Sequence, residues 1–116
     1  MRTLLELESQ GHARAALAID VFCYRLAKGI LAQCAGLTRL DALVFTGGIG
    51  ENAARVRELT TRHLALLGVA LDAERNALHG RSSHGTISAE GSRVHVLVIP
   101  TNEELEIARE TVRVIG

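Results

Sequence analysis

Apolar and polar positions in the first third of the chain repeat with helical spacing. Residues 2 to 10 show this pattern briefly, and residues 12 to 34 sustain it over many turns. The longer stretch is apolar on nearly every side, and Arg14, Arg25 and Lys28 share its one narrow polar stripe. The pattern therefore predicts a short helix and then a long helix, part of whose surface needs cover from a neighbouring domain or subunit.

The centre of the chain reads as a strand followed by a helix. Asp41 to Thr46 is a short apolar run, which predicts a buried strand. Residues 51 to 67 return to helical spacing and end at Gly68, a residue type that commonly terminates helices. The inward face of this helix is predicted to carry Val56, Leu59, His63 and Leu66.

The last third of the chain alternates short elements with turns. Asp72 is placed to cap a brief helix. Residues 86 to 89 and 93 to 99 are predicted strands joined by a tight turn, and the second is apolar on both faces, as in a strand inside a sheet. Pro100 ends that strand, and residues 102 to 114 have the spacing of a final helix. The order of elements predicts an α/β fold with helices packed on a small mixed sheet.

Composition narrows the class of protein. The 116 residues are enough for one domain with its own core, which we assign to residues 1 to 116. Thirteen Lys and Arg offset thirteen Asp and Glu, so we expect neither a nucleic acid nor a membrane as partner. Cys23 and Cys34 lie about 16 Å apart along one predicted helix, too far for a disulfide. Unpaired cysteines and the lack of a long uncharged apolar run predict a cytoplasmic protein.

The first strand-to-helix junction reads FTGGIGEN, residues 45 to 52. Three glycines in four positions exceed the need of a simple turn, so they indicate room for a ligand. Bare backbone beside the amide of Asn52 suits the sugar and phosphate portion of a nucleotide. The segment from Gly48 to Ala53 also matches G-x-G-x-x-A, with Asp72 about twenty residues later. A small dinucleotide-binding unit and a plain glycine turn are therefore alternatives.

The second junction reads IPTNEEL, residues 99 to 105. Ligands of open α/β sheets bind outside the carboxyl ends of the strands, so parallel neighbouring strands would bring both junctions to one crevice. Thr101 and Glu104 fit a capping box, which gives Glu104 a structural role. Glu103 is left over, and a free carboxylate beside a phosphate site is a suitable ligand for magnesium.

Both junctions, read in their longer context, resemble the C-terminal signatures of acetate kinases. The stretches FTGGIGENAARVRE and VLVIPTNEELEIARET carry the resemblance, which continues through DVFCYRLAKGI and LDAL. It implies the C-terminal part of a ribonuclease H-like domain of the sugar kinase, Hsp70 and actin superfamily. It also implies transfer of the γ-phosphoryl group of ATP to acetate with Mg²⁺, giving acetyl phosphate. Propionate and butyrate kinases share this architecture and are not separated from acetate kinases by these motifs.

The resemblance assigns roles to particular residues. The segment that would contact the adenosine side of ATP consists of Gly48, Ile49, Gly50, Glu51 and Asn52. Glu103 would belong to the metal site. Acetate kinases form homodimers, so a second copy is the implied protein partner, and the small-molecule partners are a nucleotide and a short-chain carboxylate.

Acetate kinases are much longer than 116 residues, and their chemistry uses arginines, a histidine, an aspartate and a phosphate loop from preceding segments. We therefore assign no catalytic residue here and expect residues 1 to 116 alone to be inactive. A non-catalytic module that binds a nucleotide or a partner chain is the alternative function. His79 and His84 are interpreted as surface residues. A solvated or packing role is expected for Arg14, Arg25, Arg55 and Arg57.

Overall fold

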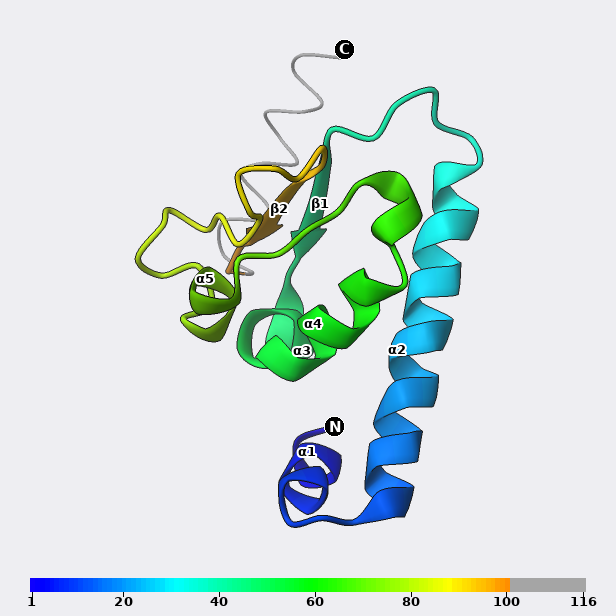
Figure 1. Ribbon diagram of the computed structural model, residues 1–116, viewed down its shortest axis with the longest axis vertical. Helices are drawn as coiled ribbons and strands as arrows, with labels where there is room; N and C mark the ends of the chain where they lie inside the picture. Colours follow the sequence, from blue (N-terminus) through cyan, green and yellow to red (C-terminus); the bar gives the residue numbers. More distant parts are fainter. Residues whose placement is uncertain (101–116) are drawn as a thin grey trace.

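The computed structural model describes residues 1–100, and within that range two helices come first. Helix α1 (Arg2–Ser9) and helix α2 (Ala13–Cys34) confirm the two helices predicted at the start of the chain. Figure 1 shows α2 along one side of the molecule, with α1 folded back beside its amino-terminal end. The glycine between them, Gly11, has φ of 88°, a conformation that lets the chain reverse direction there.

The sheet brings the carboxyl ends of its two strands to one edge. Strand β1 (Ala42–Phe45) and strand β2 (His95–Val98) are parallel neighbours, with Phe45 opposite Val98. The Ile99 amide donates to the Phe45 carbonyl at 2.9 Å just beyond the last pair. Because the strands are parallel, their carboxyl ends lie together, so the condition that the sequence left open is met.

The strand predicted over residues 86 to 89 is wrong. The segment makes only two isolated antiparallel bridges, Thr86 with Leu97 and Leu71 with Ser88. Its Ile87 amide donates to the Val96 carbonyl, and the Ile87 carbonyl accepts from the Asp72 amide, both at 2.9 Å. The segment thus pairs with β2 at one residue and with Leu71 at another, and neither pairing is long enough to form a ladder.

The helix predicted over residues 51 to 67 is also wrong in its bounds. The structure has α3 (Gly47–Asn52), α4 (Ala54–Arg62) and a 3₁₀ turn, Ala65–Leu67. The break lies at Ala53, with φ of −112° and ψ of 80°. Helix α3 packs on the end of β1, whereas α4 packs on α2, and one straight helix cannot serve both contacts. The glycines of the first junction therefore lie inside a helix rather than in a loop before it.

The early end of α4 changes which of its predicted inward residues are buried. Val56 and Leu59 are buried as expected. His63 and Leu66, expected inward, are exposed, and 86% of Leu66 is accessible to solvent. Because α4 ends at Arg62, the helical spacing no longer applies to the residues that follow, and Leu64 is buried instead.

The segment before the second strand contains the short helix α5 (Ala73–Ala77). Asp72 caps it as predicted, because its carboxylate accepts a hydrogen bond of 2.9 Å from the Arg75 amide. The chain then forms a tight loop from 79 to 85. A side chain on Gly80 would lie 2.8 Å from the Gly85 carbonyl carbon, so the two ends of this loop meet closely.

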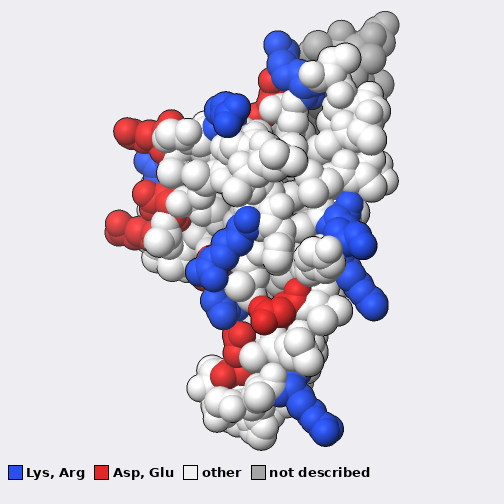
Figure 2. Space-filling view, turned by 45° about the vertical axis from the view of Figure 1, so that its right-hand side comes forward, with Lys and Arg blue, Asp and Glu red and all other residues white. Residues whose placement is uncertain are grey.

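Part of α2 remains uncovered by the described residues. Leu17, Val21 and Tyr24 occupy successive turns of this helix, and 63%, 41% and 51% of their surfaces are exposed. Figure 2 turns this side of the molecule forward and shows broad uncharged areas between separate charged side chains. Among residues 1–100, no helix combines the length and the apolar character that crossing a membrane requires.

Candidate functional site

Helix α3 separates two depressions in the surface. Gly48, Ile49 and Asn52 line one of about 630 Å³, which faces α1. Glu51 and Asn52 line the other, of about 610 Å³, which faces the end of β2 and the loop from 79 to 85. Gly50 lines neither, because it packs on β1, where a side chain would come 3.1 Å from the Phe45 carbonyl carbon. The predicted nucleotide segment is thus one short helix with two differing faces.

The depression between α1 and α3 has an apolar floor and a polar rim. Met1, just before the first helix, and Leu5 within it face Ile49 and Ala53 across the depression. Arg2 stands at the rim, paired with Glu6 at 3.5 Å, and 95% of the Arg2 side chain is exposed. A pocket of this volume with a mostly apolar lining and a few polar groups can hold an aromatic base. Sequence interpretation missed the α1 side of this pocket, since residues 2 to 10 carry no signal of which element they approach.

Of the three glycines in the first junction, Gly48 is the one that no contact and no left-handed backbone within residues 1–100 requires. It has no left-handed backbone, and a side chain added there would meet no atom within 4 Å. Its neighbour Gly47 has φ of 76° and therefore needs to be glycine. The backbone at Gly48 is open toward the depression that it lines, which leaves room for a ligand to approach closely.

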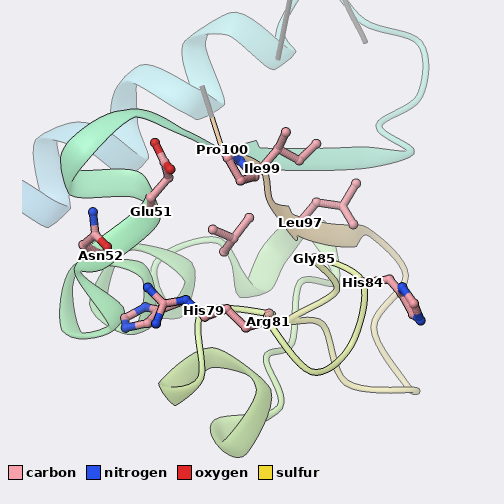
Figure 3. Close-up of a pocket in the computed structure, with 11 residues that line it drawn as sticks. Glu51, Asn52, His79, Arg81, His84, Gly85, Leu97, Ile99 and Pro100 are labelled. Atoms are coloured by element: carbon pink, nitrogen blue, oxygen red, sulfur yellow. The ribbon is translucent and has the colours of Figure 1, made fainter. Parts of the chain in front are cut away.

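The second depression is shown in Figure 3. Asn52 lies on one side, and His84 lies across the cavity from it. His79 and Arg81 come from the same loop as His84, and Pro100 marks the carboxyl end of β2. The predicted metal ligand Glu103 lies outside the described residues. Within residues 1–100, no three His, Cys, Asp or Glu side chains gather in a group that could hold a metal ion.

Arg57 of α4 connects the elements around this depression. The side chain is fully buried. Its Nη1 donates to the Gly50 carbonyl at 2.7 Å, and its Nε donates to Asn76 Oδ1 at 2.7 Å. Its Nη2 donates to the Asn76 carbonyl and to His79 Nδ1, each at 2.8 Å. Of the two roles expected for the arginines, Arg57 has the packing role, and no sequence pattern distinguished it from the exposed Arg55, which pairs with Glu8 at 3.2 Å.

Burial changes the proton affinities of two members of this group. Removal from water lowers the pKa of Arg57 to about 10. Desolvation, followed by the charges of Arg57 and Arg81, lowers the pKa of His79. His79 is half-buried and accepts from Arg57 through Nδ1, so it differs from the surface residue that the sequence suggested. His84, by contrast, is exposed as expected.

The sequence of residues 1–109 matches the Acetokinase family. The chain belongs to the acetokinase family. An acetate kinase of Stutzerimonas stutzeri (strain A1501) is 56% identical over 111 residues, which cover 96% of this chain and 28% of that protein. The chain therefore spans a little over a quarter of the length of the curated relatives that it matches.

Solved structures of the same family share the fold. A propionate kinase from Francisella tularensis subsp. tularensis SCHU S4 has a TM-score of 0.78 at 42% identity, covering 94% of this chain and 27% of that one. The acetate kinase of Porphyromonas gingivalis has a TM-score of 0.73 at 34% identity, with coverage of 99% and 29%. This acetokinase chain is thus α/β, with helices on a small sheet, and has part of the sugar kinase, Hsp70 and actin fold.

The geometry of the acetokinase chain argues against the dinucleotide alternative. Asp72 would have to lie at the end of a strand to reach a ribose, but its carboxylate caps α5. Leu71, just before it, makes a single antiparallel bridge. Gly48 and Gly50 lie within α3 instead of in a strand-to-helix turn.

Proposed function

We propose that this chain supplies the adenosine-binding part of a carboxylate kinase, which transfers the γ-phosphoryl group of ATP to acetate and gives acetyl phosphate. Membership of the acetokinase family supports a kinase role. The nucleotide site is proposed from Gly48. Its backbone is open toward a depression of about 630 Å³, and no contact within residues 1–100 requires glycine at this position. Acetate is preferred as acceptor because the S. stutzeri relative is an acetate kinase, with propionate as the near alternative.

The two sides of the depression suit different parts of ATP. Leu5, Ile49 and Ala53 offer apolar contacts to a base. Arg2 at the rim offers a cation to phosphate oxygens, and Asn52 offers a side-chain amide whose Nδ2 already donates to the Gly48 carbonyl at 3.1 Å. These residues bind and orient a nucleotide, and they include no group that would transfer the phosphoryl itself.

Magnesium is the metal that this function requires. Mg²⁺ is usually held by one or two carboxylates together with phosphate oxygens of the substrate. Glu103 is the carboxylate that we propose as its ligand, and the bound ion would neutralise charge on the phosphates. Glu104 is its neighbour of equal charge and serves as the control.

The test is thermal unfolding of the 116-residue chain with ATP and Mg²⁺, with NAD, and with Mg²⁺ alone. We expect ATP with Mg²⁺ to raise the Tm, because a ligand that binds only the folded state stabilises it, by about 2.7 kcal/mol at a hundredfold excess over Kd. Gly48→Ala should keep the Tm of the free chain, since alanine favours a helix, but should lose most of the ATP shift. Gly29→Ala on α2, equally unobstructed, should keep that shift.

Two results would contradict the proposal. A shift with NAD and none with ATP would argue for another class of nucleotide-binding protein. An undiminished ATP shift in Gly48→Ala would move the site away from α3. For the metal, Glu103→Ala should abolish the part of the ATP shift that depends on Mg²⁺, and Glu104→Ala should keep it. The reverse outcome would mean that the two glutamates have exchanged roles.

A further inference from the structure

Arg57 is held in an unusual way for a buried cation. It is 0% exposed, and none of the salt bridges among residues 1–100 includes it. Its partners are neutral acceptors on three elements: Gly50 in α3, Asn76 in α5 and His79 in the following loop. A buried arginine loses its hydration, and no carboxylate of residues 1–100 pairs with Arg57 to compensate. Only the hydrogen bonds to these neutral acceptors replace the lost water, so loss of any one of them would destabilise the buried charge.

The bond to Gly50 acts on the candidate nucleotide segment. The Gly50 carbonyl lies in the last turn of α3, where the helix leaves its final carbonyls without helical partners. The guanidinium fixes the orientation of the peptide that joins Gly50 to Glu51. This peptide lies in the stretch from Gly48, which lines the first depression, to Glu51, which lines the second. The same group holds Asn76 and His79, so α3 is tied to the loop on the far side of the second depression.

We propose that Arg57 is a positioning residue that holds the Gly48–Asn52 segment in its nucleotide-binding conformation by bonding α3 to α5 and the loop after it. The inference rests on the function proposed above and adds a residue that does not touch the ligand. Lysine cannot replace the arginine here, because one ammonium group cannot reach Gly50, Asn76 and His79 in the directions that a planar guanidinium does.

Amide hydrogen exchange of the chain without any nucleotide gives the direct test. The Ala53 amide donates to the Ile49 carbonyl at 3.0 Å and reports on α3, and the Gly80 amide donates to the Arg75 carbonyl at 2.9 Å and reports on the loop. The His95 amide, bonded to the Asp41 carbonyl at 3.0 Å, is a reference in the sheet. In Arg57→Lys we expect exchange at Ala53 and Gly80 to rise about tenfold more than at His95.

Ile87→Val is the matched control. Ile87 is also 0% exposed, and loss of one methylene there lowers global stability without touching the Arg57 bonds. Exchange in this variant should rise equally at the three reporter amides. A uniform rise in Arg57→Lys as well would overturn the proposal, as would no rise at all. Failure of Arg57→Lys to fold would also overturn it, because Arg57 would then hold the whole fold rather than this segment.

Nucleotide affinity separates this inference from the proposed function. If the wild-type chain binds ATP, Arg57→Lys should weaken binding about tenfold, whereas Ile87→Val with a similar loss of Tm should not. Equal ATP affinity in Arg57→Lys and wild type would reject the positioning role. If the wild-type chain does not bind ATP but the local exchange pattern is as expected, the proposed function fails while the link from Arg57 to α3 and the loop stands.

Discussion

His79 and His84 share a backbone conformation but have different surroundings. Their φ angles are 56° and 55°, each precedes a glycine, and both lie in the loop that borders the second depression. His84 is exposed, whereas His79 meets Arg57, whose Nη2 donates to its Nδ1. That bond requires neutral imidazole with its proton on Nε2. The role of each histidine therefore follows from its neighbours, not from its local sequence, His-Gly in both cases.

The lowered pKa of His79 predicts a dependence of stability on pH. The unfolded chain titrates this group near its usual value of 6.5, and the folded chain titrates it lower. Stabilisation by neutral His79 is thus complete above about pH 6.5 and is lost as the pH falls through the lower, folded pKa. Urea unfolding between about pH 7.5 and about pH 5 should show this loss, and His79→Asn should remove this part of the pH dependence.

His84→Asn is the control for that experiment. Asparagine tolerates a positive φ at both positions, so backbone strain is equal in the two variants. The His84 variant should keep the wild-type dependence on pH. If both variants keep it, His79 is not the group that titrates. If both lose it equally, the effect belongs to the loop as a whole and not to the bond with Arg57.

The short elements of this chain owe their bounds to contacts with other elements. The helical pattern in the sequence runs unbroken from residue 51, yet Ala53 interrupts the helix so that α3 can pack on β1 and α4 on α2. Helix α5 has only five residues, too few to be stable by propensity alone. It presents Asn76 to Arg57, and its start is fixed by Asp72.

Loss of the Asp72 cap should therefore weaken α5 and what depends on it. Asp72→Ala removes the acceptor of the Arg75 amide and should cost about 1 kcal/mol of the free energy of unfolding. Asp72→Asn retains a capping oxygen and should cost much less. Urea unfolding of both variants measures the difference. Equal losses in the two would indicate that the charge of Asp72, rather than its capping bond, stabilises the helix.

At the scale of the whole molecule, residues 1–100 leave an apolar face of α2 partly open. The face consists of Leu17, Val21 and Tyr24, which stay 63%, 41% and 51% exposed among residues 1–100 although the Tyr24 ring packs edge-on against His63. These side chains lie on successive turns, as in a helix that packs on a partner. We propose that a second copy of this chain covers the face, as in the homodimer that the resemblance to acetate kinases implies.

Sedimentation at rising concentration tests that proposal. The wild-type chain should associate, and Leu17→Glu with Tyr24→Glu should shift it toward the monomer, because two charges would have to be buried in the contact. Leu66→Glu is the matched control, since Leu66 is 86% exposed but lies outside α2. A wild-type chain that stays monomeric, or a control that dissociates equally, would show that this face does not mediate self-association.

The sequence by itself determined the elements whose patterns are long or whose bonds are local. Helix α2 follows from its sustained period, β1 and β2 from short apolar runs, and the cap of α5 from Asp72. Gly48 to Asn52 could be singled out as a candidate segment because three glycines crowd four positions. These features depend on residues within one or two turns of each other, and family membership could be inferred from the same short motifs.

Only the tertiary structure decided what those residues face. His63 and Leu66 became exposed because α4 stops early to pack on α2. Arg57 became a buried link because α5, nineteen residues later in the chain at Asn76, comes beside it. Arg2 joined the candidate nucleotide pocket because α1 folds back along α2 toward α3. In each case the partner is distant in sequence, and a local pattern holds no information on which of many apolar or polar surfaces a side chain will meet.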